Sequence, residues 1–202
     1  MVAFAFMKSY VSFPLVVTLI IVFALVLFEG VLRKGTGPKA AKDFSHDKGT
    51  TSFVGIAFVI SWIAILLSIV FNRFQIGALK PHVAFNIVGL MVMFFGIVLR
   101  TVAARTLGRF YTRTLETEPD QHVISSGIYR HIRHPGYLGN ILLFMFAGIS
   151  TSNLLTILVI VAVIVPAYTR RIRTEEEMLR HIFGKEYEEY IVRSKKLIPY
   201  LY

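Results

Sequence analysis

The chain has 202 residues, of which 55% are hydrophobic and 17% charged, and its formal net charge is +10. This composition is too apolar for an ordinary soluble globular protein and indicates a membrane protein. The chain contains no cysteine, which excludes disulfides, a thiolate nucleophile, and zinc or iron–sulfur sites with cysteine ligands.

Three uncharged runs predict transmembrane helices at Ser9–Phe28, Phe53–Phe71 and Val83–Leu99. These runs contain 20, 19 and 17 residues, and a helix needs about 17–25 apolar residues to cross a bilayer. Buried helices of a soluble protein are the alternative interpretation. They would need a polar remainder large enough to cover them, and the chain has none.

A fourth uncharged region runs for 36 residues, from His134 to Thr169. As one helix it would be about 54 Å long, whereas the hydrocarbon core of a bilayer is about 30 Å thick. Turn-forming residues gather in the middle, at Gly148–Asn153. The sequence therefore predicts a helical hairpin with arms near 137–149 and 153–169, and five membrane segments in total. Whether the short first arm crosses the whole bilayer stays open.

The predicted fold is an all-α, multi-pass membrane bundle with short cytoplasmic helices at its C-terminus. It forms a single domain over residues 1–202. Residues 1–99 hold three transmembrane helices, and residues 100–202 hold a loop, the hairpin and the C-terminal helices.

Lysine and arginine indicate how the chain lies in the membrane. Segments 29–52, 100–137 and 169–202 contain five, six and eight of these residues. By the positive-inside rule these segments face the cytoplasm, so we expect the N-terminus outside and the C-terminus inside. The positive charge then reflects topology and attraction to anionic membrane lipid. Nucleic-acid binding is not expected, because basic and aromatic residues do not alternate on one soluble face.

Polar segments lie on both sides of the predicted hairpin. Before it, the third helix is expected to continue past Arg100, followed by a short β-like stretch at 121–129 and by the sequence Arg-His-Pro-Gly-Tyr at 133–137. After it come the arginines and glutamates of 170–177. Thr174 and Glu177 have the spacing of a capping box; the alternative is that the last membrane helix runs straight through this point. Gly184 predicts a helix end, and 185–192 a further short helix.

These polar segments carry a family resemblance. The sequence Gly-Ile-Tyr at 127–129, Arg-His-Pro-Gly-Tyr-Leu-Gly at 133–139, and the pattern Glu-Glu-x-x-Leu-x-x-x-Phe-Gly-x-x-Tyr-x-x-Tyr at 175–190 resemble the isoprenylcysteine carboxyl methyltransferase family. The resemblance covers about 108–200. The five-span form is similar to prokaryotic, and specifically archaeal, members, which implies a protein of the prokaryotic cell membrane.

The resemblance implies methyl transfer from S-adenosylmethionine, which leaves as S-adenosylhomocysteine, to the C-terminal carboxylate of a prenylated cysteine. Arg171 and Glu175 would be the catalytic residues: Arg171 would face the substrate carboxylate and Glu175 would bind the polar end of the cofactor. Arg170 and Arg173 are alternatives for the substrate contact. The residues that would surround the cofactor are Gln121, His122, Val123, Ile124, Tyr129, His134, Pro135, Gly136 and Tyr137.

The residue set agrees with this chemistry. A C-terminal carboxylate, with a pKa of about 3.3–3.7, is ionised at neutral pH and needs no general base. The partners implied are an acceptor with an isoprenyl chain and membrane lipid. No metal is expected, since the six histidines show none of the helical pairings typical of metal sites.

Two other enzyme classes and one non-enzymatic class remain open. A phospholipid methyltransferase has an amine acceptor that needs a base, and His134 or Glu175 could serve. A membrane reductase of the sterol-reductase type uses NADPH, whose extra phosphate could bind the arginines of 170–173. A channel or scaffold would be expected to carry charges within its membrane segments, and the three uncharged runs have none.

Overall fold

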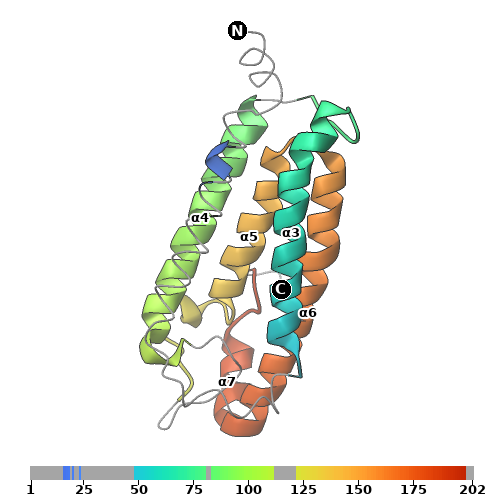
Figure 1. Cartoon of the computed structure of the whole chain (residues 1–202). Coiled ribbons are helices and arrows are strands. Elements are labelled where there is room, and N and C mark those ends of the chain that lie inside the picture. The colour runs from blue at the N-terminus through green and yellow to red at the C-terminus, as the bar shows by residue number, and fades with distance from the viewer. Residues whose placement is uncertain are drawn as a thin grey trace.

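The computed structural model describes residues 16–18, 20, 23, 48–80, 83–111 and 122–198. Its elements are the helices α3 (Thr50–Arg73), α4 (Val83–Leu107), α5 (Pro135–Ser150), α6 (Leu154–Phe183) and α7 (Lys185–Arg193), with the 3-10 turns η3 (Gly108–Phe110) and η4 (Gly127–Arg130). α4 packs against α5, α5 against α6, and α6 against α3, with α7 at one end of this bundle (Figure 1). The described residues form no strand, and the all-α prediction is confirmed.

Three of the described helices are long and apolar enough to cross a membrane, over Thr50–Arg73, Ile87–Leu107 and Leu154–Phe183. α5 has only 16 residues, or about 24 Å, less than the bilayer core of about 30 Å. The prediction of five spans ending in a membrane-crossing hairpin is therefore not confirmed. The first predicted span, Ser9–Phe28, lies mostly outside the described residues.

α6 is much longer than the predicted arm at 153–169. It runs from Leu154 to Phe183 through Pro166, and the Asn153 side chain caps its start by accepting a hydrogen bond from Thr156 N at 3.1 Å. Its 30 residues span about 45 Å, so about 10 of them extend beyond the bilayer core. The arginines and glutamates of 170–177 thus lie on the protruding end of one continuous helix, and no new helix begins at Thr174.

Gly184 ends α6, as the sequence predicted. Its φ of 51° is in the left-handed region, where a side chain would be strained. The chain turns there and continues as α7, close to the predicted 185–192.

The predicted β-like stretch at 121–129 is wrong in its described part. Residues 127–130 form the 3-10 turn η4, and Tyr129 N donates to Ser126 O at 3.1 Å. A strand needs a neighbouring strand to take up its backbone hydrogen bonds, and none lies among the described residues. The third helix does continue past Arg100, as predicted, and ends at Leu107.

α4 and α5 approach each other most closely at Gly96 and Gly139. A Cβ atom built on Gly139 would lie 2.5 Å from Gly96 O, and one built on Gly96 would lie 2.7 Å from Gly139 O. Small residues allow backbones to come this close in membrane bundles. The contact lies four residues after Pro135 and so helps to set the position of the polar start of α5.

Gly139→Ala is expected to reduce the free energy of unfolding by about 1–3 kcal/mol, because the new methyl group meets backbone atoms that cannot rotate away. Urea unfolding of the purified protein in detergent measures this loss. Gly55→Ala in α3 is the matched control, since a Cβ there meets no atom within 4 Å. Equal stability of the two variants would show that the α4–α5 contact is looser than described.

Candidate functional site

The polar start of α5 is shaped by the sequence His-Pro-Gly-Tyr. His134 is the N-cap residue and Pro135 occupies the first helical position. Proline suits this position because its φ is already helical and its missing N–H would have had no partner within the helix. His134, Pro135 and Gly136 are all buried, so this turn is part of the interior of the site.

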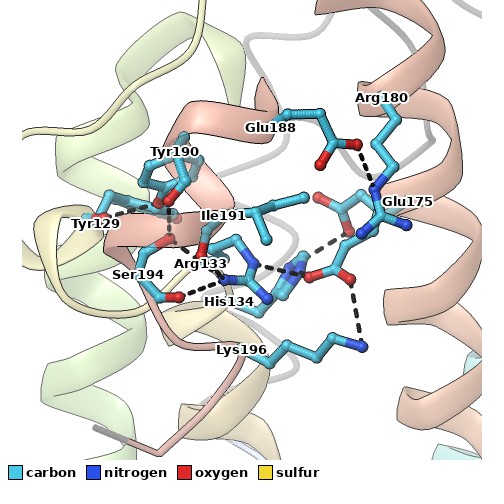
Figure 2. Close-up of polar contacts among 11 residues, drawn as sticks. Tyr129, Arg133, His134, Glu175, Arg180, Glu188, Tyr190, Ile191, Ser194 and Lys196 are labelled. Atoms are coloured by element: carbon cyan, nitrogen blue, oxygen red, sulfur yellow. Dashed lines mark hydrogen bonds and ion pairs between the residues drawn. The ribbon is translucent and has the colours of Figure 1, made fainter. Parts of the chain in front are cut away.

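The C-terminal tail, residues 194–196, lies beside the segment that precedes α5. Arg133 N donates to Lys195 O at 2.8 Å, His134 N donates to Lys196 O at 3.1 Å, and Lys195 N donates to His131 O at 2.9 Å. These backbone bonds bring the Lys196 side chain to the end of α6 (Figure 2). The tail is therefore a structural part of the site.

A first group of side chains, the Glu176 cluster, comprises Glu176, Arg133, His134 and Lys196. Glu176 Oε1 accepts from Arg133 Nε at 2.8 Å and lies 3.3 Å from His134 Nε2, while Lys196 Nζ lies 3.4 Å from Oε2 (Figure 2). Arg133 also donates from Nη1 to Ser194 O at 2.5 Å. Because a buried ion pair is stable only when its hydrogen-bonding groups are satisfied, this cluster ties α6, the start of α5 and the tail together.

A second group, the Arg171 cluster, comprises Arg171, Tyr137, Glu175, Thr50 and Thr51. Tyr137 OH donates to Glu175 Oε2 at 2.5 Å and accepts from Arg171 Nε at 3.1 Å. Arg171 Nη1 donates to Thr50 Oγ1 and to Thr51 Oγ1, each at 2.8 Å. Arg171 is only 4% exposed, whereas the Glu175 side chain is 23% exposed. The cluster thus combines a fixed guanidinium with a carboxylate that solvent can reach.

His134 links the two clusters. Its ring stacks on that of Tyr137, with centroids 5.5 Å apart and an interplanar angle of 6°. Its Nδ1 lies 4.0 Å from Glu175 Oε2, while its Nε2 faces Glu176. One imidazole therefore lies between two carboxylates of successive residues.

Buried tyrosines line the side of the site toward α7. Tyr190 OH donates to Tyr129 O at 2.7 Å (Figure 2). Burial, and next the negative charge of Glu175, raise the pKa of Tyr129 well above its ordinary value, and burial raises the pKa of Tyr190. Both phenols are therefore protonated, neutral groups at any physiological pH.

The structure brings together part of the predicted site. Arg171, Glu175, His134 and Tyr137 are joined by the contacts above. Of the other predicted residues, Tyr129, Pro135 and Gly136 are buried, Ile124 is half-buried, and Gln121 lies outside the described residues. His122 is exposed, with its ring centroid 5.7 Å from that of Phe110, and Val123 N donates to Glu186 on α7. Arg170 and Arg173 are exposed. Arg170 lies over the Phe53 ring, at 5.6 Å from its centroid.

Several residues of the site were not predicted. Thr50 and Thr51 precede Arg171 by 121 and 120 positions, and nothing in a threonine pair at the start of an apolar run indicates a distant arginine. Glu176 carried one usable signal, since a buried Arg133 needs an anionic partner, whereas nothing in the sequence indicated Lys196. Within the part of the chain that the structure describes, no group of three or more histidine, aspartate or glutamate side chains is suited to a metal ion.

The α5 and α6 residues of the site lie within a region similar to known proteins. The model of the isoprenylcysteine carboxyl methyltransferase (ICMT) family matches residues 87–181. The "Probable protein-S-isoprenylcysteine O-methyltransferase" of Oryza sativa subsp. indica is 34% identical over 125 residues, which are 61% of this chain and 65% of the rice protein. "Protein-S-isoprenylcysteine O-methyltransferase B" of Arabidopsis thaliana is 28% identical over 148 residues, 72% of this chain and 73% of the relative.

A solved structure is similar as well. The "eukaryotic intramembrane Ras methyltransferase ICMT" superimposes with a TM-score of 0.59 and 29% identity, over 73% of this chain and 52% of that chain. The chain spans less than two thirds of the length of the rice relative and about half of the solved one. These relatives are eukaryotic, so the expectation of a prokaryotic or archaeal homologue is not borne out. The family match, the relatives and the solved structure thus show that this multi-pass membrane protein is similar to isoprenylcysteine carboxyl methyltransferases.

Proposed function

We propose that this protein transfers a methyl group from S-adenosylmethionine to the C-terminal carboxylate of an isoprenylated cysteine, or of a similar lipophilic acceptor, at the cytoplasmic membrane face. The observation that carries this proposal is the Arg171 cluster, which lies where α5 begins and on the charged part of α6 that follows its apolar stretch. A site at the boundary between bilayer and cytoplasm suits two reactants that come from different phases. The prenyl chain reaches it from the bilayer, and the cofactor reaches it from the cytoplasm.

The residues of the site fit the proposed cofactor by their chemistry. When bound, S-adenosylmethionine supplies a methyl group made electrophilic by a positively charged sulfur. Glu175 is a partly exposed carboxylate that attracts the ammonium group of the amino-acid end, and the stacked rings of His134 and Tyr137 offer apolar surface. The full proposed set is Gln121, His122, Val123, Ile124, Tyr129, His134, Pro135, Gly136, Tyr137 and Glu175.

Arg171 is proposed to bind the acceptor carboxylate. A guanidinium forms strong, charge-assisted hydrogen bonds to a carboxylate, and the hydrogen bonds of Arg171 to Tyr137, Thr50 and Thr51 fix its orientation before the substrate arrives. Because the carboxylate is already ionised, no residue has to remove a proton. The contribution of the protein is then to exclude water from the anion and to hold it in line for attack.

Arg170 and Arg173 fit this role less well. Both are exposed to solvent, where water competes for hydrogen bonds and screens charge. Arg171 is buried next to Tyr137 and Glu175. The substrate contact is therefore assigned to Arg171 in this proposal.

Cofactor titration of the purified protein tests the proposed class. We expect saturable binding of S-adenosylhomocysteine and none of NADPH. Glu175→Gln is expected to weaken S-adenosylhomocysteine binding about 10-fold or more, because it removes the carboxylate that attracts the amino group. Glu177→Gln is the control, since Glu177 is exposed and pairs with Lys48. Binding of NADPH without S-adenosylhomocysteine would instead identify a reductase.

A further inference from the structure

α7 places two tyrosines in the interior of the polar end. The turn at Gly184 lets α7 (Lys185–Arg193) pack against α6. Tyr187 is 2% exposed and Tyr190 is 8% exposed, and their ring centroids are 5.9 Å apart. The other side of the helix carries exposed glutamates and lysine. The two aromatic rings are thus the buried face of an amphipathic helix, and a phenylalanine would serve that packing as well as a tyrosine.

The two hydroxyl groups differ in their partners. Tyr190 OH donates to Tyr129 O at 2.7 Å, so its hydroxyl has a clear role in the fold. Tyr187 OH is buried and has no hydrogen-bond partner among the described residues. Buried polar groups are nearly always hydrogen-bonded, and an exception needs an explanation. Within the described part of the chain, the Tyr187 hydroxyl therefore contributes no hydrogen bond to the fold.

The surroundings of this hydroxyl are those of the candidate site. Burial raises the pKa of Tyr187 well above its ordinary value, and the carboxylates of Glu176 and then Glu175 raise it further, against the opposing charge of Arg133. The hydroxyl therefore lies within electrostatic range of both clusters, although it bonds to neither carboxylate. It stays protonated, with one donor and two acceptor positions available.

We infer that Tyr187 is a cofactor-binding residue of the proposed methyltransferase, and that the amino-acid end of the bound cofactor supplies the missing partner of its hydroxyl. This inference rests on the proposed function. The ammonium group of that end suits the partly exposed carboxylate of Glu175, and its carboxylate accepts a hydrogen bond from a protonated phenol. The adenosine end is uncharged and has no ammonium group to pair with a carboxylate.

Tyr187→Phe tests the inference, because it removes only the hydroxyl. The affinity for S-adenosylhomocysteine, measured by calorimetry in detergent, is expected to fall about 10- to 100-fold, as for loss of a hydrogen bond to a charged group. The affinity for 5′-methylthioadenosine, which lacks the amino-acid end, is expected to stay unchanged. The melting temperature without ligand is expected to be equal to or higher than that of the unchanged protein, because the variant buries no unpaired hydroxyl.

Tyr190→Phe, on the same helix, is the matched control for stability. It removes the donor to Tyr129 O and is expected to lower the melting temperature. The inference is overturned by unchanged S-adenosylhomocysteine affinity in Tyr187→Phe, by an equal loss for both ligands, or by a fall in melting temperature as large as that of Tyr190→Phe. If the unchanged protein does not bind S-adenosylhomocysteine at all, the proposed function fails as well.

Discussion

Arg171→Met is expected to lower kcat/KM for methyl transfer about 100- to 1,000-fold, the usual effect of removing one preorganised donor to an anionic reacting group. Methionine keeps much of the volume of the side chain but offers no N–H group. The acceptor carboxylate then loses its cationic partner, and the hydroxyls of Thr50, Thr51 and Tyr137 lose the guanidinium that they orient. Initial rates of methyl transfer from labelled S-adenosylmethionine measure the change in kcat/KM.

Two further variants separate charge from geometry. Arg171→Lys retains the positive charge but not the planar fork of donors, so it is expected to recover only part of the lost activity. Arg173→Met removes an exposed arginine two residues away and is expected to leave the rate close to that of the unchanged protein. Full activity in Arg171→Met, or an equal loss in Arg173→Met, contradicts the assignment of Arg171.

Glu176→Gln is expected to lower the free energy of unfolding by about 3–5 kcal/mol, the usual result of removing one partner from a buried ion pair. Arg133 then remains buried without its carboxylate partner, next to the positive charge of Lys196. The first part of the protein to loosen is expected to be the tail, because Arg133 also binds Ser194 O. Thermal unfolding in detergent and the rate of tryptic cleavage after Lys195 and Lys196 report the two effects.

Glu177→Gln is the matched control for this change. Glu177 is the next residue along the same helix, but its side chain is 59% exposed and pairs with an exposed Lys48. Surface pairs contribute little to stability, so we expect unchanged unfolding and unchanged tryptic cleavage. If trypsin cleaves the tail equally slowly in Glu176→Gln and in Glu177→Gln, the Glu176 cluster does not hold the tail in place.

Hydropathy predicted the described membrane helices because their signal is local. The runs at 53–71 and 83–99 lie within α3 and α4, and the glycine at 184 ends α6. Local signals could not decide how far α6 continues. The residues around Thr174 fit a capping box and also an uninterrupted helix, and the packing of Arg171, Ile172 and Met178 in the interior favours the uninterrupted helix.

The candidate site was less predictable because it depends on tertiary contacts. Positions 175, 176 and 177 are all glutamate, but each step along a helix rotates the direction of the side chain by about 100°. Consequently Glu175 meets Tyr137, Glu176 meets Arg133, and Glu177 meets Lys48. The pairing of Arg171 with Thr50 and Thr51 depends on how α3 packs against α6, and no motif records it.

We propose above all that the two clusters, at the start of α5 and on the protruding end of α6, form a methyltransferase site for a prenylated carboxylate. Transfer of labelled methyl from S-adenosylmethionine by the purified protein tests it most directly, with farnesylcysteine and phosphatidylethanolamine offered as separate acceptors. We expect label on the carboxylate of farnesylcysteine, released as methanol by mild alkali, and none on the lipid amine. Label on the amine alone, or no transfer to either acceptor by protein that is folded and binds S-adenosylhomocysteine, would contradict the claim.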